Sequence, residues 1–261
     1  MAFPMTNIHP DARIGANVSI SPFTTIEADV EIDDNTWIGP NVTICDGARI
    51  GSNCKIFPGA VVSAVPQDLK YKGEKTLTII GNNTTIRECV TINRGTEALG
   101  RTEVGSNCLL MAYVHVAHDC VVGNNVILAN SVNLAGHVII DDWAILEGYV
   151  GVSQFIRIGK HSFIAGQTGV RKNVPPYVKA AREPLSYAGI NSVGLKRRGY
   201  SDNDINDIQE FYRVLFLRGH SVSNAISIVE ENNNSEIKKE IIEFIKQSDK
   251  GIIRGLSSSN E

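Results

Sequence analysis

The fold is decided by a stretch near the start of the chain, residues 7–32, which reads NIHPDARIGANVSISPFTTIEADVEI. Every sixth residue in it is isoleucine, from Ile8 to Ile32. The same step continues to position 62, resumes from 80 to 92, and runs from 104 to 170 without a miss. We call these residues anchors. A period of six fits neither an amphipathic helix nor alternating strands, but it is typical of a parallel β-helix with eighteen residues in each three-faced coil.

Several anchors are followed directly by glycine, as at Gly15, Gly51 and Gly105. Because glycine adopts conformations that other residues avoid, we expect these glycines to form the tight corners between the short strands. Two segments leave the six-residue step, Ser63 to Thr78 and Arg94 to Glu103. We expect both to project from the coil as loops, which often carry function on a rigid scaffold.

The repeat stops beyond Pro175-Pro176, and a helical period replaces it. Ser201 and Asp204 have the spacing of a capping box for a helix that ends near Arg218-Gly219. Ser221 and Ser235 can cap two more helices, and we expect the last to close at Gly251. The sequence therefore predicts a mainly β protein, with a catalytic β-helix over residues 1–190 and a small helical domain over 191–261 that covers the end of the coil.

Composition restricts the class of protein further. Of the 261 residues, 43% are hydrophobic, and the chain shows neither a signal peptide nor an apolar run that could cross a bilayer. We therefore expect a cytoplasmic protein without stable membrane insertion. Residues 157–198 hold nine Lys or Arg and one acid, a local charge of +8 within a net −3. This surface favours an acidic partner; no aromatic platform or recognition helix points to nucleic acid.

Candidate chemistry lies in the coils around residue 118. Adding eighteen residues places His118, Gly136 and Gln154 in one column, with successive members about 4.8 Å apart. Asp119 lies beneath His137 in the next column. An imidazole can take a proton from a hydroxyl as it attacks a thioester, and a nearby glycine N–H can stabilise the oxyanion. The column therefore suits acyl transfer, although it could also be a polar strip between subunits.

A metal is a third interpretation, because three histidines between subunits hold zinc in the γ-carbonic anhydrases, which share this fold. The spacing of His115 and His118 does not resemble those enzymes. We expect neither a metal nor a cofactor.

Segments outside the anchors resemble the UDP-N-acetylglucosamine acyltransferases, which catalyse the first step of lipid A biosynthesis. They are Gln67–Tyr71, Ile92–Thr96, His115–Cys120, Leu134–His137, Val174–Val178 and Gly194–Gly199. The resemblance extends to Gly251–Arg254 and implies a left-handed β-helix. It also implies transfer of a long (R)-3-hydroxyacyl group from acyl carrier protein to the 3-hydroxyl of UDP-N-acetylglucosamine by a homotrimer.

The resemblance implies a role for each candidate residue. His118 would be the general base, Asp119 would assist it, and Gly136 would supply the oxyanion N–H. The sugar nucleotide would be bound by Asp68, Lys70, His115, His137, Gln154, Asn191, Arg197 and Arg198. Three positions depart from the family pattern, namely Asn93, Ser153 and Val193.

Gly166 is the candidate for chain-length control. It ends a column of mostly small residues, Ala112, Asn130, Gly148 and Gly166, and stands forty-eight residues beyond His118, about 13 Å higher on the axis. The resemblance implies that glycine here accompanies long acyl donors of about fourteen carbons or more. The alternative is a turn residue that needs a positive φ.

Two other functions compete with this interpretation. The sister N-acyltransferase, which acts on a UDP-glucosamine derivative, normally carries an additional N-terminal uridine-binding domain, whereas the repeats here begin by Ile8. A non-catalytic hexapeptide scaffold would make no ordered use of the His118 column. The sequence also leaves open whether the acceptor is UDP-N-acetylglucosamine or its 3-amino analogue.

Overall fold

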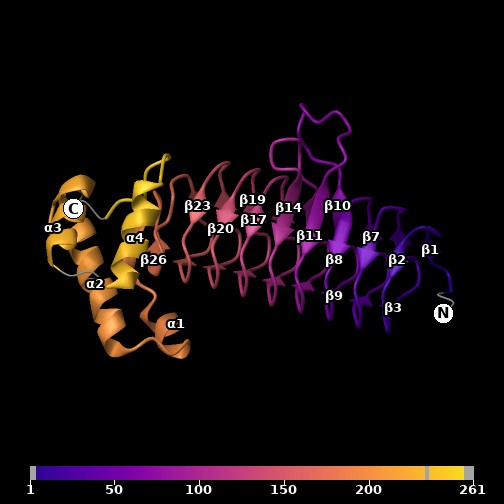
Figure 1. Cartoon of the computed structure of the whole chain (residues 1–261), viewed down its shortest axis with the longest axis horizontal. Coiled ribbons are helices and arrows are strands. Elements are labelled where there is room, and N and C mark those ends of the chain that lie inside the picture. Colours follow the sequence, from indigo (N-terminus) through magenta and orange to yellow (C-terminus); the bar gives the residue numbers. More distant parts are fainter. Residues whose placement is uncertain (1–3, 233–234, 256–261) are drawn as a thin grey trace.

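Each six-residue repeat contributes one short strand, and the strands stack into the triangular coils of a left-handed parallel β-helix (Figure 1). The computed structural model describes residues 4–232 and 235–255. From β1 to β25, consecutive strands enter the first, second and third sheet in turn, and β26 and β27 both join the third.

The three sheets run the length of the coil. The first sheet contains β1 (Asn7–Ile8), β4 (Thr25–Ile26), β7 (Thr43–Ile44), β10 (Val61–Ala64), β13 (Thr91–Asn93), β16 (His115–Val116), β19 (Asn133–Leu134), β22 (Gly151–Val152) and β25 (Gly169–Val170). The second contains β2 (Arg13–Ile14), β5 (Glu31–Ile32), β8 (Ala48–Ile50), β11 (Leu77–Ile80), β14 (Arg101–Val104), β17 (Val121–Val122), β20 (Ile139–Ile140) and β23 (Arg157–Ile158). The third contains β3 (Ser19–Ile20), β6 (Trp37–Ile38), β9 (Lys55–Ile56), β12 (Thr85–Ile86), β15 (Leu109–Leu110), β18 (Ile127–Leu128), β21 (Ile145–Leu146), β24 (Phe163–Ile164), β26 (Val178–Ala181) and β27 (Ser186–Ile190).

The anchors form the core, as the period predicts. Ile38, Ile44 and Ile56 have no exposed surface, whereas Ile8 and Ile14 at the open end of the coil are only partly buried. Parallel pairing aligns residues eighteen apart, for example His115 with Asn133 and Asn133 with Gly151. Each fully buried Ile or Leu contributes about 1.5–3 kcal/mol, so the ladders hold the coil together without a ligand.

The corners differ from the prediction. The residue with a left-handed backbone stands three positions after the anchor. It need not be glycine, since Asn53, Asn107 and Asp119 all have a positive φ there. Gly51 and Gly105, directly after the anchor, do not have a positive φ. A Cβ on Gly105 would lie 2.6 Å from the carbonyl carbon of Gly123 in the next coil. Glycine is therefore needed for close approach between coils, and the expectation that it turns the corner is wrong.

Both interruptions project as loops, but they are shorter than predicted. Residues 63–64 extend β10, residues 77–78 begin β11, and residues 101–103 belong to β14, which leaves 65–76 and 94–100 outside the strands. The loop between β10 and β11 rises from one side of the coil (Figure 1). It is tied to the second loop, because the Thr76 hydroxyl donates to the Gly95 carbonyl and Arg94 Nε donates to the Tyr71 hydroxyl.

Within the described residues, four helices follow the last coil: α1 (Ser192–Arg197), α2 (Asp202–Leu217), α3 (Val222–Asn232) and α4 (Glu236–Lys246). The capping box of Ser201 and Asp204 is present, and Ser235 caps α4. The sequence did not predict α1, and α4 ends at Lys246 rather than near Gly251. Gly251 instead accepts a hydrogen bond from the Asn173 N–H, which returns the chain to the coil. Among the described residues, no helix is long and apolar enough to span a membrane.

Candidate active site

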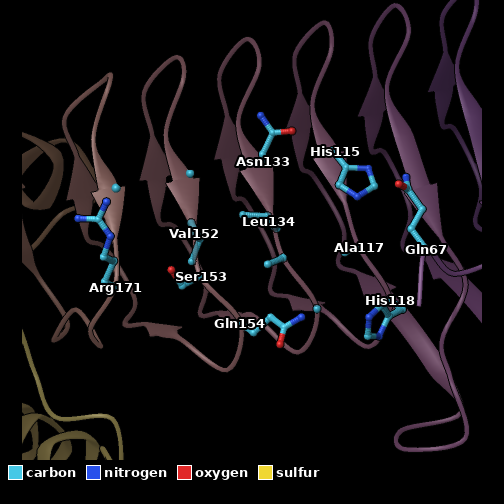
Figure 2. A pocket seen from close by; sticks show the side chains of 14 residues that line it. Gln67, His115, Ala117, His118, Asn133, Leu134, Val152, Ser153, Gln154 and Arg171 are labelled. Carbon is cyan, nitrogen blue, oxygen red and sulfur yellow. The ribbon is translucent and has the colours of Figure 1, made fainter. Parts of the chain in front are cut away.

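A groove of about 620 Å³ runs along the first sheet over β16, β19, β22 and β25. His115, His118, Gly136 and Gln154 line it, as their shared eighteen-residue spacing predicts. Figure 2 shows His115 and His118 on one coil and Gln154 two coils further along. Gln67 reaches the groove from the loop between β10 and β11.

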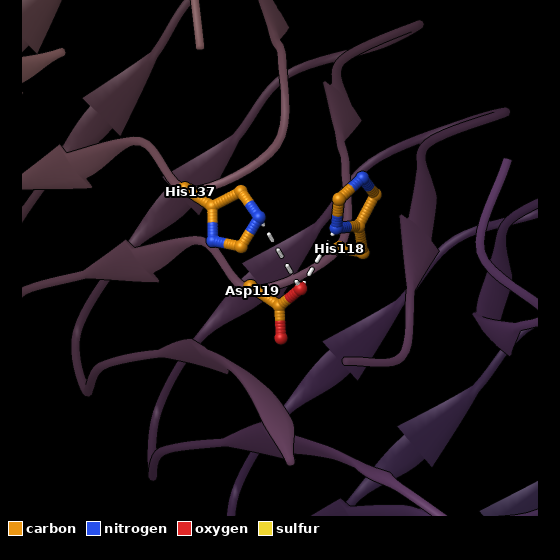
Figure 3. Close-up of side chains that lie close together, drawn as sticks. All are labelled: His118, Asp119 and His137. Atoms are coloured by element: carbon orange, nitrogen blue, oxygen red, sulfur yellow. Dashed lines mark hydrogen bonds and ion pairs between the residues drawn. The ribbon is translucent and has the colours of Figure 1, made fainter. Parts of the chain in front are cut away.

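His118 is held by the carboxylate of its own neighbour. His118 Nδ1 lies 2.8 Å from Asp119 Oδ2, and both side chains are buried (Figure 3). A carboxylate accepts hydrogen bonds, so Nδ1 carries the proton in this contact and Nε2 has the free lone pair. This tautomer is the one that a general base requires.

Asp119 is in turn held by the second interruption. Its Oδ1 accepts the Thr96 N–H at 2.9 Å, and its Oδ2 accepts the Thr96 hydroxyl at 2.6 Å. Burial alone would raise the pKa of Asp119, but the hydrogen bonds from Thr96 and His118 outweigh it and hold that pKa below its usual value. Asp119 therefore stays ionised and orients the imidazole.

Gly136 lies directly against the His118 ring. A Cβ at this position would be 2.6 Å from Cε1 and 2.7 Å from Nε2 of His118, so a side chain there would displace the imidazole. The Gly136 N–H donates no hydrogen bond within the described residues. An unpaired N–H one coil from the base is suited to stabilising an oxyanion.

The other two histidines are neutral neighbours of this pair. His137 Nε2 lies 3.8 Å from Asp119 Oδ2, and its ring stacks on Phe155 at 4.5 Å. The His115 ring shares a hydrogen bond of 2.7 Å with the Thr91 hydroxyl. Burial, followed by the proximity of His118, lowers the pKa of His115, and burial likewise lowers the pKa of His137. Both can therefore bind a polar substrate without adding positive charge.

His118, Asp119 and His137 also meet the geometric requirement for a metal site, with candidate ligand atoms within 4.8 Å of one another. Asp119 is already the acceptor for Thr96 and His118 through both of its oxygens. This hydrogen-bonded arrangement favours proton transfer over metal binding.

Two further predicted site residues are Asp68, in the loop between β10 and β11, and Gly166, in the upper coils. Asp68 lies close enough to influence the pKa of His137, and it accepts a hydrogen bond from the backbone N–H of Lys70. Gly166 stands beside Gly148, with its N–H donated to Glu147. Its φ is not positive, and the left-handed residue is the next one, Gln167. The turn alternative for Gly166 is therefore wrong.

The predicted nucleotide contacts lie elsewhere in the chain. Asn191, Val193 and Arg197 line a separate pocket of about 330 Å³ over β21, β24 and β26 of the third sheet. Asn191 caps α1 by accepting the Gly194 N–H, and it donates to the His161 carbonyl. The Arg198 guanidinium lies 4.9 Å from the centre of the Trp143 ring.

The sequence interpretation gave no role to several residues around the site, among them Thr91, Thr96 and Phe155, and it placed Arg171 only in the basic surface of residues 157–198. Thr96 was part of a quoted segment, but its loop is out of register, so its partner could not be found by adding eighteen. The signal for Phe155 was available, because position 155 lies eighteen residues after His137.

The coil and the paired histidine and carboxylate define a hexapeptide-repeat acyltransferase. The bacterial transferase hexapeptide (six repeats) model matches residues 29–64 and 101–136, and domain 2 of UDP N-acetylglucosamine O-acyltransferase matches residues 173–253. The chain belongs to the acyl-[acyl-carrier-protein]–UDP-N-acetylglucosamine O-acyltransferase family.

Relatives support this assignment over nearly the whole chain. The family member of Chlorobaculum parvum is 55% identical over 248 residues, which cover 92% of this chain and 94% of that protein. The crystal structure of a UDP-N-acetylglucosamine acyltransferase from Bacteroides fragilis matches with a TM-score of 0.95 at 48% identity, over 97% of this chain and all of that one. The Francisella novicida enzyme matches with a TM-score of 0.96 at 41% identity, over 99% and 96%. These relatives favour neither the N-acyltransferase nor the scaffold alternative.

Proposed function

We propose that this chain transfers a long (R)-3-hydroxyacyl group from acyl carrier protein to the 3-hydroxyl of UDP-N-acetylglucosamine. The observation that carries the proposal is the His118–Asp119 pair, buried beneath Gly136 at the floor of an open groove. The names of the relatives supply the donor and the acceptor.

The geometry accounts for each step of the transfer. His118 Nε2 removes the proton of the sugar hydroxyl while the oxygen attacks the thioester carbonyl. The Gly136 N–H stabilises the oxyanion, and the ionised Asp119 stabilises the imidazolium that forms. When the intermediate collapses, the carbon–sulfur bond breaks and the leaving thiolate takes the proton from His118. Asp68, Lys70, His115, His137 and Gln154 would hold the sugar in the groove.

The separation of the two pockets supports a homotrimer. His118 stands at the corner directly after β16 of the first sheet and lines the groove over that sheet, whereas Asn191 and Arg197 line a pocket over the third sheet of the same chain. If both groups act on one sugar nucleotide, the first sheet of one copy must face the third sheet of another. Such a contact between unlike faces closes into a ring, as a threefold assembly requires. The guanidinium groups of Arg197 and Arg198 would then serve the diphosphate.

We further propose that the protein acts in the cytoplasm and that its donor is a long-chain hydroxyacyl carrier protein. Acyl carrier proteins are acidic, so the basic surface of residues 157–198 would assist their approach. This surface is weaker than the sequence count indicates, because Arg157 pairs with Asp141 and Lys160 pairs with Glu240.

The test is an acyl-transfer assay with product mass as the readout. Purified protein is incubated with 3-hydroxyacyl carrier protein and either UDP-N-acetylglucosamine or its 3-amino analogue. We expect an ester with the first acceptor. Faster amide formation with the second acceptor would contradict the proposed acceptor, and no transfer to either would contradict the proposed reaction.

A further inference from the structure

The corner between the second and third sheets carries different residues in its lower and upper coils. Three positions after the anchor, six successive coils have asparagine, namely Asn17, Asn35, Asn53, Asn83, Asn107 and Asn125. The last three coils have Trp143, His161 and Tyr177 there instead, and the φ is positive at every one of these positions. Asparagine adopts this conformation readily, whereas bulky side chains adopt it at a cost. The three rings therefore point to a role beyond closing the coil.

The three rings form one stack that is fixed on two sides. The Trp143 and His161 rings are nearly parallel, with centres 6.1 Å apart, and the His161 and Tyr177 rings are nearly parallel at 5.7 Å. Tyr200, which follows α1, packs edge-on against His161 at 5.2 Å and Tyr177 at 5.9 Å. The Tyr177 hydroxyl donates to Glu240 of α4 at 3.2 Å. The stack therefore gives the segment around α1 a fixed surface to pack on.

His161 holds both ends of α1. Asn191, which caps the start of this helix, donates from its side-chain amide to the His161 carbonyl at 2.9 Å. Arg198, which follows the helix, donates from Nη1 to His161 Nδ1 at 3.3 Å. With six residues α1 is too short to be stable by itself, so these contacts determine where it lies. Two predicted nucleotide contacts, Asn191 and Arg198, thus depend on one residue.

The protonation of His161 fits this arrangement. Burial, followed by the charges of Arg198 and Lys160, lowers the pKa of His161 to about 4, so the imidazole is neutral at pH 7. A guanidinium group only donates, so Nδ1 is the acceptor for Arg198. Nε2 then carries the proton and donates to the Tyr200 hydroxyl at 3.1 Å. A neutral ring of this kind orients the guanidinium without cancelling its charge.

The charge of Arg198 is not compensated by a carboxylate. Its side chain is partly buried, and its contacts are His161 and the Trp143 ring, whose centre lies 4.9 Å from the guanidinium carbon. Within residues 4–232 and 235–255, Arg198 forms no ion pair, whereas Lys196 of α1 pairs with Asp202 at 3.2 Å. A partly buried charge is unfavourable unless an anion compensates it. The guanidinium is therefore suited to an anionic ligand.

We infer that His161 is a positioning residue for the acceptor: it fixes the Arg198 guanidinium over Trp143, ready for the diphosphate of the sugar nucleotide. This inference rests on the proposed function. His161 does not touch the substrate itself, because its ring is buried between Trp143 and Tyr177. A group that is already in place binds with a smaller loss of conformational freedom. Loss of the imidazole should therefore weaken acceptor binding and leave the chemical step nearly unchanged.

The experiment is a double-mutant cycle of His161→Phe and Arg198→Gln. Phenylalanine keeps a ring in the stack and the backbone carbonyl that binds Asn191, but it has no acceptor for Arg198. We expect His161→Phe to raise the KM for UDP-N-acetylglucosamine about tenfold, with kcat within about twofold of the parent. Arg198→Gln should raise the KM at least as much. The double variant should not exceed Arg198→Gln alone, because the two residues act as one unit.

Two further variants separate positioning from folding. His161→Asn places an acceptor near the level of Nδ1, and this corner already has asparagine in the coils below, so it should recover a KM close to that of the parent. Asn107→Phe puts the same ring at the same corner three coils lower, away from α1, and should leave the KM unchanged. Thermal unfolding of each variant shows whether the fold is retained.

Three outcomes would overturn the inference. His161→Phe could leave the acceptor KM at the parent value, it could lower kcat instead, or its effect could multiply with that of Arg198→Gln in the double variant. The last outcome would show that the two residues act independently. Binding of UDP to the same four proteins of the cycle, measured by calorimetry, tests the inference without any transfer. If the parent bound UDP but transferred no acyl group, the proposed function would fail and the binding cycle would still decide the role of His161.

Discussion

The lower coils, residues 7–62, and the upper coils, residues 104–170, share one ladder of anchors but use the same corner differently. In the lower coils, the positions two and three after the first-sheet anchors Ile8, Ile26 and Ile44 are Pro10-Asp11, Ala28-Asp29 and Asp46-Gly47. In the upper coils they are His118-Asp119, Gly136-His137 and Gln154-Phe155. The backbone geometry is repeated, whereas the corner side chains differ.

The aspartates at these corners have different partners in the two halves. Asp29 forms an ion pair with Arg49 at 2.6 Å, and Asp46 accepts the Asp29 N–H at 2.8 Å, so these carboxylates stabilise their own coil. Asp119 instead accepts a hydrogen bond from the Thr96 hydroxyl and orients the His118 ring. The anchors therefore carry the fold while the corner pairs carry the chemistry, and substitutions in the two halves should have different effects.

The largest expected effect follows from removing the base. His118→Ala should lower the rate of transfer by about 10²- to 10⁴-fold, because general-base assistance is lost. The lower-coil control is His9→Ala, which removes a half-exposed imidazole whose Nδ1 accepts the Asp11 N–H. It should leave the rate unchanged. The measurement is steady-state transfer together with thermal unfolding, and similar rates for both variants would contradict the general-base assignment.

Two glycine substitutions should separate activity from stability. Gly136→Ala should reduce kcat by about 10²-fold, because its Cβ would push the His118 ring from its position. Gly51→Ala should instead destabilise the protein by about 1–3 kcal/mol and leave the rate of the folded enzyme intact, because its Cβ would lie 2.3 Å from Asn82 Oδ1 and 3.0 Å from Asn82 N. Activity assays and urea unfolding of both variants are needed. A reversal of the two effects would refute the division between the halves.

The third comparison concerns pH. The pKa of Asp119 is lowered in the folded state, so its stabilising contribution is present above the ordinary carboxyl pKa of about 3.9 and is lost as the pH falls through the folded pKa. Thr96→Val removes one donor to this carboxylate and should cost about 1.5–3 kcal/mol at pH 7, with a smaller cost below about pH 4.

The control for that variant is Thr36→Val in the lower coils. Among the described residues, the Thr36 hydroxyl donates to the Gly51 carbonyl and accepts the Cys54 N–H, and both partners are backbone groups. Loss of the Thr36 hydroxyl should lower the free energy of unfolding by about 1–3 kcal/mol, and by the same amount at every pH. Urea unfolding from pH 3 to pH 7 distinguishes the two, and parallel curves would show that Asp119 is not the titrating partner of Thr96.

The sequence predicted what depends on the constant coil. A fixed step of eighteen placed His118 below Gly136 and Asp119 beside His137, because parallel pairing keeps the register in the upper coils. It could not place Thr96, since the loop at 94–100 breaks the step and returns the chain to Asp119 from outside the coil.

Short-range structure was predicted less well. The helix α1 is six residues long, too short to show a helical period, and only the Asn191 cap marks its start. Gly51 was assigned to a corner because a sequence shows that glycine is required but not why. Conformational freedom and close approach give the same residue, and the structure separates them by the φ of Gly51, which is not positive, and by the short distances to Asn82.

The last and smallest effect on total rate is expected at Gly166, in a column that also differs between the halves. Two positions after third-sheet anchors the lower coils have Pro22, Pro40 and Pro58, whereas the upper coils have Ala112, Asn130, Gly148 and Gly166. A Cβ on Gly166 would lie 3.0 Å from the Gly148 carbonyl oxygen and 3.5 Å from Glu147 Cβ, and the φ of Gly166 is not positive, so a larger side chain fits after a small adjustment.

If the acyl chain rises along this column, Gly166→Met should stop it about 13 Å above His118, after about ten carbons. Selectivity should then move from about fourteen carbons toward ten, with each methylene that loses its buried place costing about 0.8 kcal/mol. Gly148→Met, one coil lower, should shorten the preferred chain by roughly four carbons more, because one coil is about 4.8 Å. Competition between hydroxyacyl carrier-protein donors of different length, read by product mass, measures the shift. The same loss for every donor in both variants would show that this column does not hold the chain.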